Sequence, residues 1–248
     1  MLGSVGNLLA IGVPKRTADG FANAGAAELY EPLSGTRLVV FRNPSPNASD
    51  LFGSAIVSVG GNVLIGAPGD DTAGLDAGAV YLMDPGTGRL GRTATNPNPT
   101  LAGGPVGAVL ASSGARAAGG APLDDSHATD AGGVYVFDFD PNSATFGQLL
   151  RTLRSVNGAP AGGKFGTSVA FRGNRLLVGA ESDGQTVAGS GAAFLFDAGT
   201  GAHVNTFKKS SPVNLDRFGA AVAFLGDHVA IGVPAHHVRG TEPGADHR

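Results

Sequence analysis

Carboxylates at a repeated spacing are the residues of this sequence best suited to chemistry. Each of two Gly-Ala-Pro segments, beginning at Gly66 and Gly120, is followed by three aspartates. Carboxylates at such spacing could wrap a hard cation such as Ca²⁺, which takes several oxygen ligands. Alternatively, they accept hydrogen bonds from backbone N–H groups in Asx-turns and orient the loop. Both interpretations stay open for the two sets, which are Asp70, Asp71 and Asp76, then Asp124, Asp125 and Asp130. Asp183 occupies the first of these positions in a further unit.

A second acidic stretch has the alternate spacing of a calcium-binding loop at Asp138, Asp140 and Asn142. The glycine expected next is Ser143, and the twelfth position holds Leu149 where a bidentate Glu should stand. An Asp-Pro-Asn turn explains these residues without a metal. We therefore expect no required cofactor, with calcium as the one candidate ion.

Other patterns offer less chemistry. Residues 158–164 nearly match a phosphate-binding loop, but Phe165 replaces the magnesium-binding hydroxyl residue and no helix is expected after it. There is no G-x-S-x-G nucleophile motif, and His127 is the one loop histidine flanked by carboxylates within the repeats. His236, His237 and His247 lie in a polar tail, and Asn47-Ala48-Ser49 is a glycosylation sequon.

The composition excludes several classes of protein. The 248 residues carry a net charge of −3 with no basic cluster, so a nucleic acid is not an expected partner. No stretch approaches the roughly 18 apolar residues that span a bilayer, and the first nine residues lack an export-signal pattern. There is no cysteine, which removes disulfides and thiol nucleophiles. The 41 glycines and 15 prolines indicate many short strands joined by turns.

These loops belong to a repeat of about 54 residues. Gly-Ala-Pro and its variants recur with spacings of 54, 54, 59 and 53 residues, at Gly12, Gly66, Gly120, Gly179 and Gly232. A Phe-Gly pair precedes this anchor at Phe52, Phe165 and Phe218, with weaker versions at Val106 and Leu2. A third anchor follows it, at Gly25, Gly78, Gly132 and Gly191.

Each unit predicts four strands, which in the second unit are Phe52–Val59, Asn62–Ala67, Gly78–Met83 and Gly88–Thr95. Four strands make one blade of a β-propeller, so the predicted fold class is an all-β propeller of four-stranded antiparallel blades. The second and third strands are apolar on both faces, as expected where blades stack face to face. A parallel β-helix is the rival fold, but its rungs are about half as long.

The order Phe-Gly, Gly-Ala-Pro and Gly-Ala-Val-Tyr-Leu resembles the FG-GAP repeat of integrin α-subunit propellers and of secreted bacterial proteins. The resemblance implies an extracellular β-propeller. Two features depart from the family. The calcium loop of integrin blades, between strands one and two, is replaced here by a short Gly-Asn hairpin. Family propellers close with about seven blades, whereas this chain holds four units and half of a fifth.

The predicted units are approximately 1–50, 51–104, 105–163 and 164–216, with a partial unit at 217–234 and a disordered polar tail at 235–248. The ring is therefore expected to be incomplete. Either the chain is a fragment of a longer propeller, or its exposed blades pair with a second copy.

Function follows from the connections between strands. The long connections, from strand two to three and from strand four to the next unit, should emerge on one face and form a binding surface. The resemblance then implies a non-catalytic adhesion module that takes a protein or glycan ligand outside the cell. The alternatives are a propeller domain of a secreted hydrolase or lyase, and a structural spacer.

Overall fold

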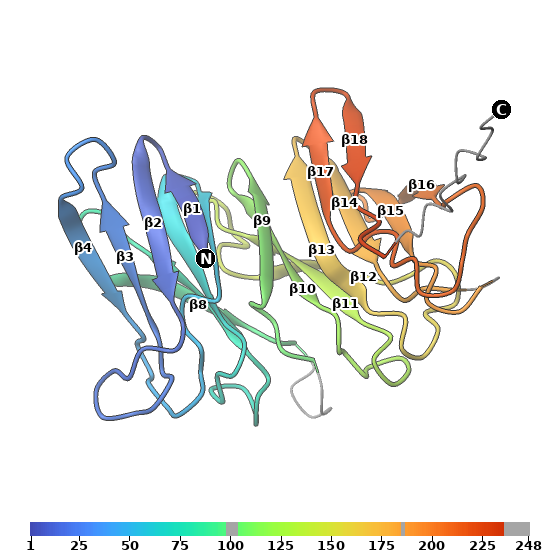
Figure 1. Ribbon diagram of the computed structural model, residues 1–248. Helices are drawn as coiled ribbons and strands as arrows, with labels where there is room; N and C mark the ends of the chain where they lie inside the picture. Colours follow the sequence, from blue (N-terminus) through green and yellow to red (C-terminus); the bar gives the residue numbers. More distant parts are fainter. Residues whose placement is uncertain (98–103, 185–186, 236–248) are drawn as a thin grey trace, which may run out of the picture.

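The computed structural model describes residues 1–97, 104–184 and 187–235, and its regular structure in these ranges consists of strands alone (Figure 1). The fold class predicted from the sequence is confirmed. The predicted polar tail lies outside the described residues apart from Ala235. In chain order the strands are β1 (Leu2–Val5), β2 (Leu8–Val13), β3 (Ala26–Tyr30), β4 (Arg37–Arg42), β5 (Ala55–Val59), β6 (Asn62–Ala67), β7 (Ala79–Met83), β8 (Leu90–Thr95), β9 (Val109–Ser113), β10 (Arg116–Ala121), β11 (Gly133–Asp138), β12 (Leu149–Leu153), β13 (Phe165–Arg172), β14 (Arg175–Ala180), β15 (Ala192–Asp197), β16 (His203–Phe207), β17 (Val222–Leu225) and β18 (His228–Ile231).

Consecutive strands pair in antiparallel hairpins to form five sheets. The first four sheets have four strands each, in the orders β1-β2-β3-β4, β5-β6-β7-β8, β9-β10-β11-β12 and β13-β14-β15-β16. The fifth sheet contains β17 and β18. Because every ladder between named strands is antiparallel, the parallel β-helix is excluded as the fold of the described residues.

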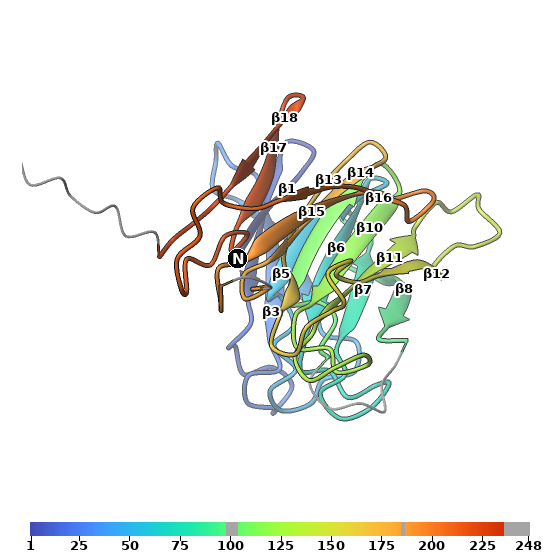
Figure 2. The same cartoon turned by 90° about the vertical axis from the view of Figure 1, so that its right-hand side faces the viewer.

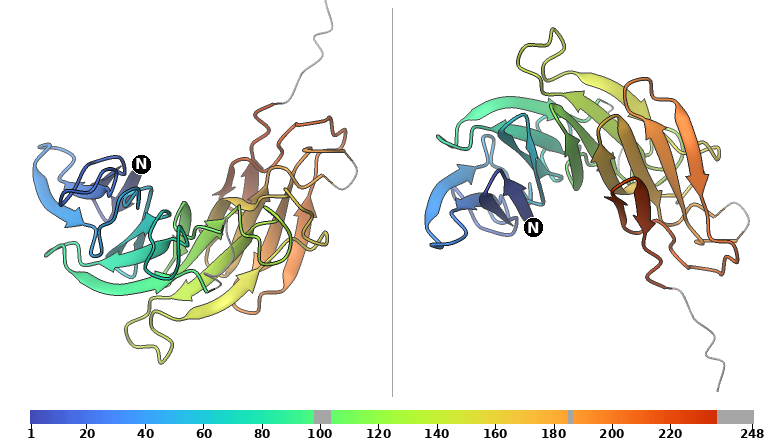
Figure 3. Two further views of the ribbon diagram at one scale, coloured as in Figure 1. Left: turned by 90° about the horizontal axis from the view of Figure 1, so that it is seen from below. Right: turned by 90° about the horizontal axis from the view of Figure 1, so that it is seen from above.

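The sheets stand side by side as the blades of an incomplete propeller. The first strand of each sheet lies against the first strand of the next, so that β1, β5, β9, β13 and β17 follow one another along the inner side. Figure 3 shows the result as an arc whose first and last sheets lie apart. The described blades do not close into a ring, as the count of repeats predicted.

The strand ends differ slightly from the prediction in the second unit. Strand two is as predicted, but the ladder of strand one begins at Ala55 instead of Phe52. The reason is that Gly53 has a φ of 97°, which bends the backbone out of the extended conformation. Phe52 instead forms an isolated parallel bridge with Gly25 of the preceding unit.

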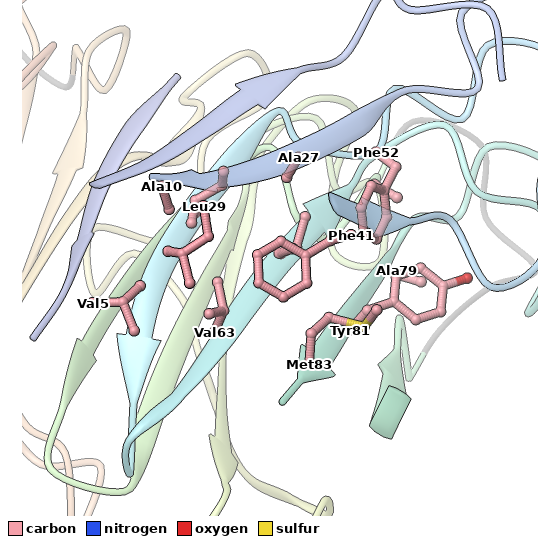
Figure 4. Packing of buried hydrophobic residues seen from close by; sticks show 13 residues of the cluster. Val5, Ala10, Ala27, Leu29, Phe41, Phe52, Val63, Ala79, Tyr81 and Met83 are labelled. Carbon is pink, nitrogen blue, oxygen red and sulfur yellow. The ribbon is translucent and has the colours of Figure 1, made fainter. Parts of the chain in front are cut away.

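The core is divided into three clusters, each between two successive sheets. In the cluster between the first and second sheets, Leu29 and Phe41 face Tyr81 and Met83, and all four side chains are buried (Figure 4). Phe52 inserts at the edge of this cluster, with its ring centroid 5.7 Å from that of Tyr81. Burial of an aromatic side chain contributes about 2–3 kcal/mol, so the Phe-Gly anchor stabilises the contact between blades.

The two glycine anchors meet across the same interface. A Cβ atom built on Gly66 would lie 2.0 Å from the carbonyl oxygen of Gly107 in the next unit. The equivalent distances for Gly12, Gly120 and Gly179 are 2.0, 2.2 and 1.9 Å, each to the carbonyl oxygen of the Phe-Gly glycine that follows. The repeat spacing therefore encodes a backbone contact between blades that only glycine permits.

The long connections emerge on one face of the array, as predicted. In Figure 1 the loops from β2 to β3 and from β4 to β5 lie at the bottom, whereas the hairpin turns lie at the top. We call the former side the long-loop face. The longer spacing between the third and fourth units arises on the opposite side, in the β11–β12 connection, which projects at the right of Figure 2.

Candidate binding face

The long loops are held to one another by a short backbone ladder that recurs along the array. The loop that enters a sheet donates N–H groups to the loop between the second and third strands of the sheet before it. Three such bonds are made at the second, fourth and fifth sheets, and one, from Val106 N to Ala77 O, among the described residues at the third. Between the first two sheets the bonds are Ser49 N to Ala22 O (2.8 Å), Leu51 N to Asn23 O (3.0 Å) and Phe52 N to Ala24 O (3.1 Å). The same three bonds recur from Gly162, Lys164 and Phe165, and from Leu215, Arg217 and Phe218. The described parts of the long loops are thus tied to one another by backbone hydrogen bonds.

The first aspartate of each Asp-rich loop is buried and bonded to a tyrosine. Asp70 is 1% exposed and accepts a hydrogen bond from the Tyr81 hydroxyl on Oδ2, while its Oδ1 accepts one from the Thr72 N–H at 2.9 Å. Asp124 is 2% exposed and bonds Tyr135 in the same manner. Burial raises the pKa of Tyr81, and the hydrogen bond to Asp70 raises it further, so this hydroxyl remains a donor.

The second and third aspartates form a cap within the loop. Asp71 Oδ1 accepts the backbone N–H of Asp76 at 2.8 Å, and Asp125 Oδ1 accepts that of Asp130 at 2.6 Å. Asp76 and Asp130 have φ values of 49° and 50°, a conformation that aspartate tolerates better than most residues. These contacts are Asx-type caps, which is one of the two roles expected from the sequence.

The structure does not bring the six aspartates into one centre. Each set stays within its own loop, and the described residues hold no group of three or more His, Asp or Glu side chains placed around one ion. An oxygen of each of four carboxylates is taken by a backbone N–H, in Asp70, Asp71, Asp124 and Asp125. Calcium binding by these loops stays a prediction.

The first aspartate of the loop has different partners in the fourth and third units. Asp183 follows the register of Asp70, but Phe194 replaces the tyrosine, and Ser155 Oγ and Asn157 Nδ2 donate instead at 2.7 and 3.2 Å. Asp124 has in addition the Arg154 guanidinium at 3.8 Å. Each buried carboxylate is thus given donors from its own surroundings, as burial of a charge requires.

Two further buried aspartates were not recognised from the sequence. Asp50 and Asp216 stand two residues before Phe52 and Phe218, and they are 0% and 1% exposed. Asp216 is paired with the Lys209 ammonium at 2.9 Å. The recurring Asp-x-Phe-Gly pattern was the signal that could have revealed them.

Asp50 is bonded differently from Asp216. Its Oδ2 accepts hydrogen bonds from Asn43 Nδ2 and the Asn47 N–H, both at 2.6 Å, while Oδ1 is buried without a hydrogen-bond partner among the described residues. Burial raises the pKa of the Asp50 carboxyl and the nearby Asp70 carboxylate adds to the rise, whereas the two hydrogen bonds oppose it.

The other residues that the sequence singled out as possible sites have no metal- or phosphate-binding geometry among the described residues. Asp138 accepts the Asp140 N–H and the Thr145 hydroxyl, which is the turn expected there, and these hydrogen bonds hold the pKa of Asp138 below its usual value against the opposing effect of burial. Residues 158–164 lead into β13 without a helix. His127 and Asn47 are exposed. The histidines His236, His237 and His247 lie outside the described residues.

Replacement of Tyr135 by phenylalanine tests the buried bond. We expect Tyr135→Phe to lower the free energy of unfolding by about 1–3 kcal/mol, because Asp124 Oδ2 would lose its hydroxyl donor inside the core. Urea denaturation followed by circular dichroism measures the change. Tyr30→Phe is the control, since Tyr30 donates to Glu28 at the partly exposed edge of the first sheet and should cost less. Equal losses in the two variants would contradict this role for Tyr135.

Two segments of the chain match the FG-GAP repeat family model, at residues 45–83 and 157–196. Each match runs from the loop before a Phe-Gly pair to the third strand of the sheet that follows. No curated protein matches the chain. In the described ranges no helix is long and apolar enough to cross a membrane. The anchors that lock neighbouring blades together are the residues for which this repeat is named, and the two matched segments are FG-GAP repeats.

Proposed function

We propose that the chain is a non-catalytic binding module that works outside the cell and uses its long-loop face to hold a protein or glycan ligand. FG-GAP repeats form propellers that often serve in binding and adhesion and are typically extracellular, which supports both parts of the proposal. The choice of a protein or glycan as ligand rests on the family resemblance, and the choice of the long-loop face rests on the surface chemistry of the loops.

Exposed apolar side chains on the long loops carry the proposal. Leu75 is 83% exposed in the β6–β7 loop, and Leu215 is 61% exposed in the loop that enters the fifth sheet. Smaller exposures occur on other long loops, at Phe21, Leu123 and Val156, and at Val213 on the same loop as Leu215. Because apolar side chains gain free energy when they leave water, a series of them on rigid loops favours a contact surface.

The rigidity of this face supports recognition over a spacer role. The recurring backbone ladder and the buried Asp–Tyr bonds fix the loops before a ligand arrives. A surface that is already ordered loses little conformational entropy on binding, so shallow contacts from several loops can add to a useful affinity.

The inner side of the array supports binding over catalysis. A groove of about 450 Å³ runs along the first strands and is lined by small and apolar residues, namely Leu2, Gly3, Ser4, Ile56, Val57, Ser58, Ala111, Ser112 and Phe171. None of these side chains is a general acid or base at neutral pH. A hydrolase or lyase of this architecture would need such groups at the axial mouth.

Self-association through the incomplete fifth sheet also stays a prediction. β17 and β18 pair with each other alone among the described strands, and Leu225 at their turn is 62% exposed. These features are compatible with a second copy as partner.

Loop-tip substitutions test the binding face. The double variant Leu75→Ser and Leu123→Ser should lose at least about tenfold in affinity, because it removes two apolar contacts worth together more than about 1.4 kcal/mol. The measurement is binding of the purified chain to an array of defined glycans and purified extracellular proteins. Because Leu75 is 83% and Leu123 38% exposed, their replacement should lower the melting temperature only slightly.

Leu33 provides the matched control. It is 96% exposed in the β3–β4 hairpin on the opposite side of the array. Leu33→Ser should bind every array component as the unmodified chain does. If the control and the double variant lost binding to the same extent, the long-loop face would not be the binding surface.

A further inference from the structure

The outer face of the first sheet contains a pocket that the binding face does not explain. Its volume is about 230 Å³, and three arginines line it, Arg16 from the β2–β3 loop and Arg37 and Arg42 from the two ends of β4. Asp19 is the one acidic residue of the lining. The first sheet stands at one end of the arc, so this side of it faces away from the second sheet (Figure 3).

Comparison between units shows that the pocket replaces an apolar contact. In the second sheet Tyr81, three residues after Gly78, packs against the first sheet and bonds Asp70. At the same two positions the first unit has Glu28, three residues after Gly25, and Arg16, four residues after Gly12 as Asp70 is after Gly66. The Arg16–Glu28 ion pair thus stands where the second, third and fourth units have an aspartate and an aromatic ring.

Glu28, which is not itself a lining residue, holds two of the arginines of the pocket. Its Oε1 lies 2.9 Å from Arg16 Nη1 and 3.2 Å from Arg37 Nη1, while its Oε2 accepts the Tyr30 hydroxyl at 2.6 Å. The Tyr30 hydrogen bond and the two guanidinium groups hold the pKa of Glu28 below its usual value, against the opposing effect of burial. Glu28 is therefore ionised at neutral pH and orients both guanidinium groups.

The charges of the pocket do not balance. Arg42 Nη1 lies 3.5 Å from Asp19 Oδ1, so three guanidinium groups face two carboxylates, Glu28 and Asp19. The arginine side chains are 46%, 53% and 72% exposed, while that of Glu28 is 12% exposed. Each guanidinium has five N–H donors in a fixed fork that matches carboxylate, sulfate and phosphate oxygens.

We propose that this pocket binds the oxyanion group of a small acidic ligand, with Arg37 and Arg42 as the contacting cations and Arg16 as the third wall. The bound oxyanion supplies the negative charge that the lining lacks. Glu28 acts as a positioning residue, since it holds the guanidinium groups before the ligand arrives and so reduces the entropy lost on binding. This site is separate from the apolar contacts proposed for the long-loop face, and neither depends on the other.

The test is isothermal titration of the full chain with sodium sulfate, inorganic phosphate or sodium glucuronate at constant ionic strength. We expect one-to-one binding of at least one of these anions. Preference among the three tells whether the natural group is a sulfate, a phosphate or a carboxylate. Arg37→Gln and Arg42→Gln should each weaken binding at least about tenfold, the loss of one charge-assisted contact.

Arg89→Gln is the matched control, because Arg89 is an exposed arginine of the second unit outside the pocket. It should bind as the unmodified chain does, and so should the Leu75→Ser and Leu123→Ser double variant. Circular dichroism checks that each variant is folded. The proposal is overturned if none of the three anions binds at up to about 20 mM, or if Arg42→Gln binds them unchanged.

Discussion

Gly66→Ala should destabilise the protein by about 3 kcal/mol, although it adds a single methyl group. The new Cβ atom would lie 2.0 Å from the carbonyl oxygen of Gly107, 2.8 Å from its carbonyl carbon and 2.9 Å from its Cα. All three atoms are backbone, so no side-chain rotation can relieve the overlap, and the second and third sheets must move apart. Urea denaturation followed by circular dichroism measures the loss.

Whether Gly66→Ala raises or lowers the free energy of unfolding distinguishes a tight contact between blades from a glycine that has room for a methyl group. Where space and backbone permit, replacement of glycine by alanine stabilises a protein by about 0.4–1 kcal/mol through the unfolded chain. Gly91→Ala in β8 is the control, because Gly91 is exposed and its nearest neighbour would be 3.4 Å away. A neutral result for Gly66→Ala would mean that the blades tolerate separation, and that the repeated glycine does not hold them together.

The spacing of glycines was enough to predict the repeat, the antiparallel sheets and the open ring. It was not enough to predict why the anchors recur. Gly66 and Gly107 are far apart in the sequence, and their contact arises only when the second and third sheets are stacked. Each unit supplies only one side of this interface. No pattern within a single unit could therefore reveal the contact.

The aspartate loops show a second limit of sequence reasoning. The spacing of Asp70, Asp71 and Asp76 is compatible with a metal site and with backbone caps, because both roles need carboxylate oxygens directed into a loop. The geometry that separates the two roles depends on Tyr81, whose hydroxyl reaches Asp70 from the next strand. The tyrosine was recognised as part of a strand, but its partner could not be inferred without the register.

The arginine pocket was missed for a related reason. Alignment of the units on Gly-Ala-Pro places Arg16 opposite Asp70, which looks like divergence when one position is considered alone. Only together with Glu28 opposite Tyr81 does it become clear that the two positions still touch and that donor and acceptor have changed places. Such paired exchanges are visible in a repeat protein when two positions that touch are compared across all units.

The second large effect concerns the Phe-Gly phenylalanine. Phe165→Ala should lower the free energy of unfolding by about 3–5 kcal/mol, because the side chain is fully buried between the third and fourth sheets. Its ring lies 5.6 Å from that of Phe194 and 5.9 Å from that of Phe196, and a cavity at this point would face rigid strands on both sides. Urea denaturation measures the total loss.

Phe218 provides a test of where the stability comes from. It occupies the same position before the fifth sheet, where only two strands are described, and it is half-buried. In an array stabilised by contacts between neighbours, removal of an anchor costs what the adjoining interface contributes. Phe218→Ala should therefore cost clearly less than Phe165→Ala. Hydrogen exchange should show early loss of protection in the fourth sheet of Phe165→Ala, while the first and second sheets stay protected. Equal costs for the two variants would instead indicate that the phenylalanines stabilise their own blades, and that the interfaces contribute little.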